Sequence, residues 1–247
     1  PMLSDVRVRQ GVAYCTNRDA LTASVYGFLT PAQRQLLMMD TFLPNEHWAH
    51  ATPTHTYAYN PTLGQQLLDQ AGWAYQPGDA YRSNPSGQTL EFSVTTTTST
   101  LRETYLKLLK AQLAACGIRL KVIQTAPDWL FGQDTGLVRR DFESAAFAWI
   151  GEANPSGRSL YGCDVIPNPA TAWTGQNFMG WCNDTAHTAL LQATQTLTQS
   201  TRLAGYTILQ EAFAADMISL PLFRRLAVHA VDLSLVGYAP SPYMSAY

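Results

Sequence analysis

The sequence predicts an α/β fold, and residues 90–123 predict it most directly. Leu90 to Thr95 alternates apolar and polar side chains as a strand does, and the helical stretch from Leu101 to Cys116 has its large apolar residues on one face. Gly117 ends that helix, and Ile118 to Ile123 alternates again. A strand, a helix and a second strand in succession form a βαβ unit, which implies a parallel strand pair with a right-handed crossover.

The composition is that of a globular protein. The 247 residues are 46% hydrophobic and 14% charged, and 16 basic against 18 acidic residues give a formal net charge of −2. Because disordered chains combine few apolar residues with a high net charge, a disordered chain is excluded. The charge balance supplies no positive field for nucleic acid. No apolar run reaches the roughly 18 residues of a membrane span.

The other elements follow from helix caps and periodicity. Asn60 and Pro61 are residue types that begin a helix, and Gly72 is one that ends it. Residues 27–59 lose periodicity and form a long connection, which is typical of loops that carry function or pack on a neighbour. The remaining expected elements are helices over 5–19, 18–26 and 129–138, a buried strand over 142–150, helices over 184–199 and 201–215, and short strands over 218–223 and 227–231.

The four cysteines divide into two kinds by their surroundings. Cys15 and Cys116 lie in amphipathic segments, which favours buried, unreactive thiols. Cys163 and Cys182 lie in loop-like sequence rich in glycine, proline and asparagine, and they are candidates for a disulfide that closes this loop. Such a disulfide implies an oxidising compartment. No Cys-x-x-Cys pair occurs, which argues against a zinc ribbon or a thioredoxin-like site.

No sequence motif for catalysis, metal or cofactor binding is present. The chain contains no Gly-x-Ser-x-Gly, P-loop or Gly-x-Gly-x-x-Gly sequence. His47, His50 and His55 lie close together, but their spacing matches neither a helical pair of ligands nor a zinc finger. We therefore expect no enzyme, no bound metal and no cofactor.

Tryptophan and amide side chains gather after the expected strand over 142–150. Ligands of α/β folds lie beyond the carboxyl ends of the strands, and aromatic walls with amide groups suit an uncharged polar ligand such as a peptide backbone or a sugar. The alternative is that these residues are core aromatics and asparagine turns. The set comprises Trp149, Asn154, Trp173, Gln176, Asn177 and Trp181.

Several short stretches, in one order along nearly the whole chain, together resemble a known family. They are Leu3–Gln10, Asn17–Leu21, Tyr59-Asn60-Pro61, Leu67-Leu68, Ala71-Gly72-Trp73, Gln112-Leu113, Gly117-Ile118, Asp141-Phe142-Glu143, Ala148-Trp149, Gly175-Gln176-Asn177 and Ile218–Phe223. With these residues the chain resembles the family 5 extracellular solute-binding proteins, the dipeptide and oligopeptide receptors of ABC importers.

The resemblance implies a periplasmic-binding-protein-like lobe of type II, in which helices flank a mixed, mostly parallel sheet. Residues 1–223 are then the second ligand-binding lobe, and residues 224–247 are a hinge and return segment that packs on the first lobe. The start at Pro1 is then a cut in a longer protein whose first lobe lies on the N-terminal side. The pair Cys163 and Cys182 resembles a loop disulfide of some family members.

The resemblance also implies roles for individual residues. Trp149 corresponds to the aromatic residue that ends a strand and lines the ligand groove. Glu152 stands where oligopeptide receptors have an aspartate that pairs with the amino terminus of the peptide. Asn154, Gln176 and Asn177 are expected on adjoining ligand-binding loops. Trp173 is expected at the same site from the cluster of tryptophan and amide side chains described above.

The function implied by the resemblance is that of a substrate-binding component. The protein is expected to be a monomer that binds peptides between two lobes and delivers them to an ABC permease, without nucleic acid. It is expected outside the cytoplasm, periplasmic or extracellular, and membrane-anchored as a lipoprotein in its full-length form. The alternatives are an oligosaccharide, opine or nickel-complex receptor of the same fold, a stand-alone interaction domain, and a hydrolase.

Overall fold

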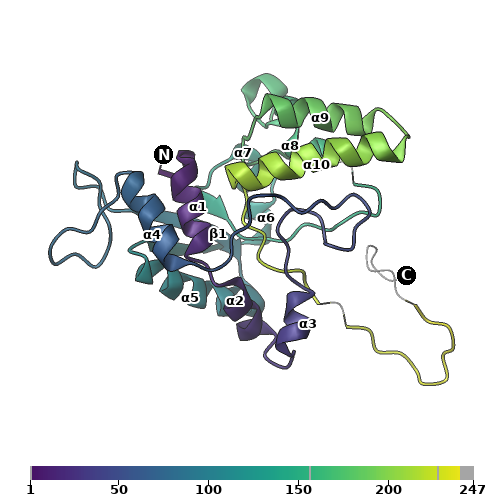
Figure 1. Ribbon diagram of the computed structural model, residues 1–247, viewed down its shortest axis with the longest axis horizontal. Coiled ribbons are helices and arrows are strands. Elements are labelled where there is room, and N and C mark those ends of the chain that lie inside the picture. Colours follow the sequence, from purple (N-terminus) through teal and green to yellow (C-terminus); the bar gives the residue numbers. More distant parts are fainter. Residues whose placement is uncertain (1, 156, 227, 240–247) are drawn as a thin grey trace.

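The computed structural model describes residues 2–155, 157–226 and 228–239, and a three-stranded sheet lies at its centre (Figure 1). The strands are β1 (Glu91–Thr97), β2 (Arg119–Thr125) and β3 (Ser144–Ala145), in the order β2–β1–β3. Helix α5 (Thr100–Ala115) connects β1 to β2, and both strand pairs are parallel. The predicted βαβ unit is therefore confirmed.

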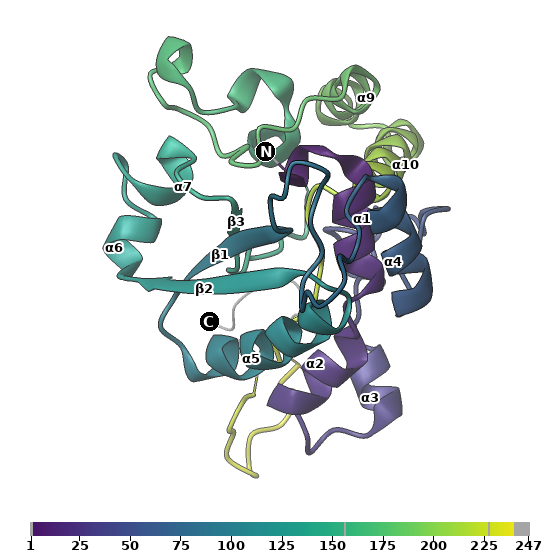
Figure 2. The same ribbon diagram turned by 90° about the vertical axis from the view of Figure 1, so that its left-hand side faces the viewer.

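Helix α5 covers one face of the sheet, and the larger hydrophobic core lies between them (Figure 2). Successive side chains of a strand point to opposite faces, so every second residue of a strand reaches this core. Phe92 and Val94 of β1 and Leu120 of β2 pack with Leu106 and Leu113 of α5. Three further helices contribute to this core, namely α1 (Val6–Tyr14), α2 (Arg18–Val25) and α4 (Pro61–Gln70).

The N-terminal helices begin at the residues that cap them. The side chain of Asn17 accepts a hydrogen bond from the backbone N–H of Ala20 and starts α2, so the helix predicted over 5–19 ends early, at Tyr14. Asn60 caps α4 in the same way, and Gly72 follows its end with a φ of +87°, as predicted. The connection over 27–59 contains one short helix, α3 (Pro31–Gln35).

Helices α1 and α4 lie in close contact near a second disulfide that the sequence did not predict. A Cβ atom on Gly64 would lie 2.7 Å from Sγ of Cys15, so only glycine fits at this position. Cys15 is bonded to Cys116, which follows α5, and both residues are buried. The prediction of two unreactive thiols was wrong, because packing of α1 against the βαβ unit brings together cysteines 101 positions apart.

Helices α9 (Asp184–Thr194) and α10 (Gln199–Asp216) form a long pair with a smaller core of their own (Figure 1). Leu190, Leu209 and Phe213 are buried there, together with Tyr161 of α8 (Arg158–Tyr161). The two helices predicted over 184–199 and 201–215 are thus present with shifted ends. Among the described residues, no helix combines the length and the apolar character needed to cross a bilayer.

Two predictions between residues 129 and 150 were wrong. The helix over 129–138 is instead two short helices, α6 (Pro127–Leu130) and α7 (Gly136–Arg139), since the Thr135 hydroxyl donates to the backbone oxygen of Trp129 and makes a turn. The strand over 142–150 is reduced to β3, which pairs with β1 only at Val94 and Thr95. Beyond that pairing the chain runs to the surface, where Ile150 is 88% exposed.

The strands predicted over 218–223 and 227–231 are also wrong for the part of the chain that the structure describes. The backbone N–H of Arg224 donates to the carbonyl of Leu37, and no strand partner lies alongside the described segment before it. Residues 228–239 extend away from the body of the molecule with Val228, Leu233 and Val236 exposed (Figure 1). Residues 227 and 240–247 of the predicted return segment lie outside the described residues.

Candidate ligand-binding site

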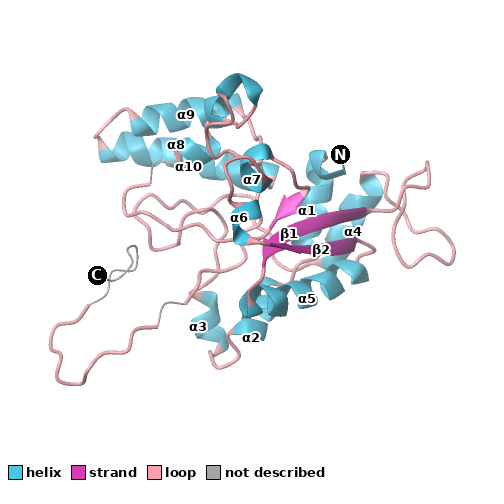
Figure 3. Ribbon diagram, turned by 180° about the vertical axis from the view of Figure 1, so that it is seen from behind, coloured by secondary structure: helices cyan, strands magenta, loops and turns pink. Residues whose placement is uncertain are grey.

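At the carboxyl ends of the strands, β2 leads into α6 and β3 into the segment 146–155 (Figure 3). Four aromatic side chains, those of Phe131, Phe147, Trp149 and Phe178, form a row in which each ring contacts the next. The ring centroid of Phe147 lies 5.9 Å from that of Phe131 and 5.2 Å from that of Trp149. Trp149 stacks on Phe178 at 6.1 Å with the ring planes 14° apart. Trp149 is 46% exposed and Phe131 is 53% exposed, so this aromatic row offers ring surface to a ligand.

Glu152 lies three positions beyond Trp149 in the same exposed segment. Among the described residues its carboxylate has neither an ion pair nor a hydrogen bond, whereas its backbone oxygen accepts a hydrogen bond from His47. An exposed carboxylate without a partner is available to a cationic group of a ligand.

The other predicted site residues fall into separate places. The carbonyl of the Asn154 side chain accepts a hydrogen bond from the Arg202 guanidinium at 2.6 Å. Gln176 is exposed, and the guanidinium of Arg139 lies 4.6 Å from the ring centroid of Trp173. Trp149 and Glu152 therefore share one segment, while Trp173 packs on α7.

Asn177 is a structural residue and not an accessible ligand contact. Its side chain is 0% exposed. The side-chain amide donates to the backbone oxygens of Gly162 and Trp181, and its oxygen accepts the N–H of Trp181. Because every polar group of this side chain is used within the chain, we correct the sequence-based expectation that Asn177 contacts the ligand.

Three members of the aromatic row were missed by the sequence reasoning. Phe147 and Trp149 stand two positions apart in an extended segment, so they share a side of the chain, and this spacing is a signal in the sequence. Phe131 and Phe178 come from distant segments, and no local pattern predicts that they reach the same row.

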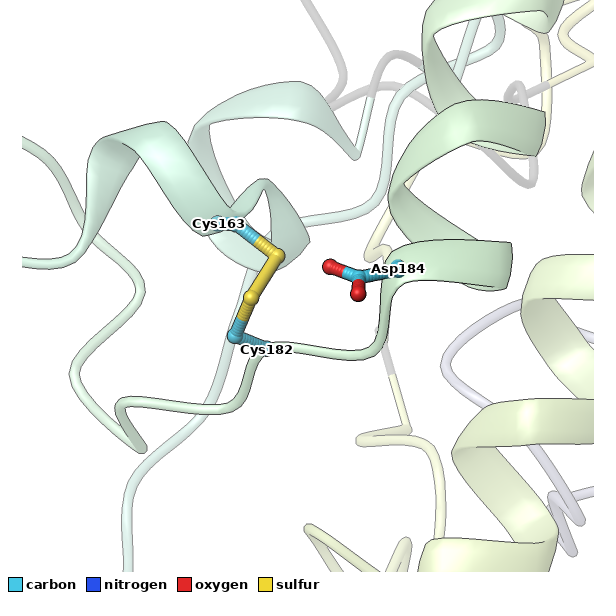
Figure 4. A group of neighbouring side chains, drawn as sticks. All are labelled: Cys163, Cys182 and Asp184. Atoms are coloured by element: carbon cyan, nitrogen blue, oxygen red, sulfur yellow. A yellow bond between two sulfur atoms is a disulfide. The ribbon is translucent and has the colours of Figure 1, made fainter.

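The predicted disulfide between Cys163 and Cys182 is present at the surface, next to Asp184 (Figure 4). These three residues are the one group of potential metal ligands found among the described residues. The sulfur atoms are bonded to each other and provide no thiolate, so the group does not suit a metal ion. Nearby, a hydrogen bond from Arg158 lowers the pKa of Asp164.

The three histidines of the 47–55 region lie in different surroundings. His47 bonds to the backbone of Ala49 and Glu152, whereas His55 bonds to Thr54 and Glu211. His50 is half-buried, and burial lowers the pKa of its imidazole. The arrangement does not bring the three rings to one metal position.

A separate hollow of about 480 Å³ lies over the sheet face opposite α5. Ser93 and Thr95 form its floor, and Arg140, Asp141 and Glu143 line its side. The carboxylate of Glu143 already accepts hydrogen bonds from the N–H and the hydroxyl of Ser93. None of the residues that line this hollow belongs to the aromatic row, but Trp129 and Phe142 of its lining pack in the same hydrophobic cluster as Phe147 and Phe178.

Comparison with known proteins identifies the family. The family model described as bacterial extracellular solute-binding proteins, family 5 Middle, matches residues 1–164. The chain is 27% identical to the di/tripeptide-binding protein 2 of Pseudomonas aeruginosa over 98% of this chain and 41% of the relative. It is 21% identical to the dipeptide-binding protein of Escherichia coli over 97% of this chain and 41% of that protein.

A solved structure gives the same fold. The oligopeptide-binding protein of Thermus thermophilus, in complex with a pentapeptide, aligns with a TM-score of 0.79 at 22% identity, over 90% of this chain and 38% of that one. The chain thus spans about two fifths of the length of these relatives. Its fold is that of a periplasmic binding protein, and the chain belongs to family 5 of the bacterial extracellular solute-binding proteins.

Proposed function

We propose that the chain is the second lobe of an extracellular receptor that binds peptides and delivers them to an ABC permease. The observation that carries this proposal is that one exposed segment holds both Trp149 of the aromatic row and, three positions on, Glu152, whose carboxylate has no partner among the described residues. A carboxylate pairs with the protonated α-amine of a peptide, and the rings contact an apolar side chain. The peptide-binding names of two relatives matched over nearly the whole chain support this choice.

The proposed division of the chain assigns residues 1–223 to the lobe and 224–247 to the segment that returns to the first lobe. Val228, Leu233 and Val236 expose apolar surface to water in the described part of this segment. Large apolar residues exposed together in one segment are typical of a surface that another part of a protein covers. The greater length of the relatives supports a first lobe as that covering part.

The proposed receptor has no catalytic role, acts as a monomer and requires no cofactor. Its ligand lies between the two lobes, closure of the lobes buries it, and the closed form docks on the permease. The two disulfides support a location outside the cytoplasm, periplasmic or extracellular. Membrane anchoring as a lipoprotein is part of the same proposal.

A thermal-shift screen of the full-length receptor against pooled peptides and pooled oligosaccharides tests the ligand class. A ligand that binds only the folded state raises stability by about 2.7 kcal/mol at a hundredfold excess over Kd. We expect a rise in Tm with peptides. A rise with oligosaccharides alone contradicts the peptide assignment.

The role of Glu152 is tested with one peptide in two forms, with a free amine and with an N-acetyl group. Glu152→Gln is expected to raise Kd for the free-amine peptide about tenfold, the contribution of one charge-assisted hydrogen bond. The N-acetyl peptide should bind the variant and the parent equally. Asp79→Asn, which removes an exposed charge from a distant turn, controls for net charge. Equal affinities of Glu152→Gln and parent for both peptides contradict the assignment.

A further inference from the structure

The segment around Glu152 has no helix or strand, yet side chains from distant parts of the chain hold its backbone. The Nε2 atom of His47 lies 3.0 Å from the backbone oxygen of Glu152. The indole N–H of Trp48 donates to the backbone oxygen of Ala153, also at 3.0 Å. His47 and Trp48 are adjacent residues of one turn, so two successive donors meet two successive carbonyls.

The next two residues of the segment are held by α10. The Arg202 guanidinium donates to the side-chain oxygen of Asn154, and the hydroxyl of Tyr206 donates to the backbone oxygen of Pro155. Arg202 also lies over the Trp48 ring, 4.9 Å from its centroid. Four successive residues of an irregular, largely exposed segment therefore each accept a hydrogen bond from a side chain of the 47–48 turn or of α10.

The hydrogen bonds of His47 define the tautomer of its ring. The backbone N–H of Ala49 donates to Nδ1 at 3.1 Å, so Nδ1 carries no proton. The proton of the neutral ring is then on Nε2, which donates to the carbonyl of Glu152. The side chain is 4% exposed and the Trp48 ring packs beside it, so the imidazole occupies a fixed position.

We infer that His47 is a positioning residue for the ligand site: with Trp48 it fixes the backbone of Glu152 and Ala153 so that the Glu152 carboxylate faces the ligand without a protein partner. This inference rests on the proposed peptide-binding function. Regular structure would fix a backbone through its own hydrogen bonds, and this segment has side-chain donors in their place. A carboxylate held in position loses less conformational freedom when a cation binds.

Two substitutions separate the two hydrogen bonds of His47 in the full-length receptor. His47→Gln places an amide donor near the position of Nε2 and removes the acceptor for Ala49. His47→Asn places an acceptor near the position of Nδ1 and removes the donor to Glu152. We expect His47→Asn to raise Kd for a free-amine peptide roughly tenfold, while His47→Gln stays within about threefold of the parent.

The ligand pair used for Glu152 distinguishes positioning from general destabilisation. The loss in His47→Asn should be confined to the free-amine peptide, because an N-acetyl peptide does not use the carboxylate. His50→Asn is the matched control, since no hydrogen bond reaches its Nε2, and it should bind both peptides as the parent does. Trp48→Phe removes the donor to Ala153 while keeping an aromatic ring, and it should repeat the selective loss.

The outcomes assign the failure to one proposal or the other. If the parent receptor binds no peptide, the proposed function fails. If the parent binds peptides but His47→Asn retains full affinity, or loses affinity equally for both peptides, the positioning role is contradicted. The positioning role is also contradicted if His47→Gln, and not His47→Asn, loses affinity for the free-amine peptide. Should neither His47 variant fold, unchanged selectivity in Trp48→Phe contradicts the inference.

Discussion

The guanidinium of Arg9 donates two hydrogen bonds to the backbone oxygen of Asp216, from Nε at 2.8 Å and from Nη2 at 2.6 Å. Arg9 belongs to α1, and Asp216 is the last residue of α10. The carbonyls at the end of a helix have no partner within it, and a positive charge there is favourable for the helix dipole. This contact joins the core around the sheet to the core between α9 and α10.

We expect Arg9→Ala to destabilise the protein because it leaves the end of α10 without this cap. Hydrogen bonds that involve a charged group each contribute about 1.5–3 kcal/mol, so the free energy of unfolding should fall by about 3 kcal/mol. Urea denaturation followed by circular dichroism measures the change. Lys107→Ala, at an exposed position of α5, should change stability by less than about 0.5 kcal/mol. Equal effects of the two variants would rule out the proposed contribution of Arg9.

Gly64→Ala is expected to separate α1 from α4. The added methyl group would lie 2.7 Å from Sγ of Cys15 and 2.9 Å from the backbone oxygen of Gly11. Overpacking of this kind costs about 1–3 kcal/mol, which thermal unfolding would show as a lower Tm. Gly151→Ala is the matched control because its methyl group would meet no atom within 4 Å. An unchanged Tm for Gly64→Ala would contradict the prediction, because it would show that α1 and α4 accommodate the added methyl group without loss of stability.

The two disulfides should be reduced in order. Cys182 is exposed, whereas Cys15 and Cys116 are both buried, so a thiol reagent reaches the Cys163–Cys182 bond first. Reduction of the native chain with increasing dithiothreitol, followed by alkylation and mass spectrometry, should label Cys163 and Cys182 before the other pair. The chain-entropy model gives about 4.7 kcal/mol for a loop of about 100 residues against about 3 kcal/mol for one of about 15. Simultaneous labelling of all four cysteines would contradict the prediction.

Stability should decrease at alkaline pH through Tyr57. Burial raises the pKa of its hydroxyl to about 12, and the hydroxyl donates to the backbone oxygen of Ala214 at 2.8 Å. In the unfolded chain a tyrosine ionises near pH 10, so the contribution of Tyr57 is complete below about pH 10. It is lost as the pH rises toward about 12, by up to about 1.4 kcal/mol per unit.

Tyr57→Phe isolates this contribution from those of other tyrosines. The variant should be less stable than the parent at pH 8, because the hydrogen bond to Ala214 is lost, and its stability should fall less steeply above pH 10. Chemical denaturation at pH 8, 10 and 11 measures both slopes. Parallel slopes for parent and variant would show that Tyr57 does not titrate in this range.

The aromatic row should select peptides with aromatic side chains, if the proposed function holds. In the full-length receptor, Trp149→Ala interrupts the row and should raise Kd for such a peptide about three- to tenfold, as expected for one aromatic pair. Trp149→Phe keeps a ring and should restore most of the affinity. A glycine-only peptide is the control, and isothermal titration calorimetry gives the affinities. A loss that is equal for both peptides would contradict selection by the row.

The local features of the fold were predictable because neighbouring residues determine them. Side-chain alternation and the helical pattern between the two alternating stretches predicted the βαβ unit. The start of α4 depends on the capping side chain of Asn60, and its end depends on the positive φ that Gly72 adopts, so single residues predicted both ends of this helix. The loop between Cys163 and Cys182 is short, so the two cysteines remain near each other whatever the rest of the chain does.

The predictions that were wrong concern features that depend on contacts between distant residues. A strand requires a partner, and β1 offers β3 a partner only at Val94 and Thr95, so the apolar run over 142–150 did not become a strand. Asn177 and the segment of Glu152 show the same dependence within the site. The Asn177 side chain is buried by contacts with distant residues. The backbone oxygen of Glu152 accepts a hydrogen bond from His47, which lies 105 positions away in sequence.

The sequence by itself determined the βαβ unit, the helix caps, the short disulfide loop and the motifs of the family. Only the tertiary structure decided that Cys15 bonds to Cys116, that four aromatic rings form one row and that Arg9 caps α10. The physical reason is the range of the interactions. Dihedral preferences and hydrophobic periodicity act between near neighbours, whereas burial, ring contacts and side-chain caps form only after distant segments have packed together.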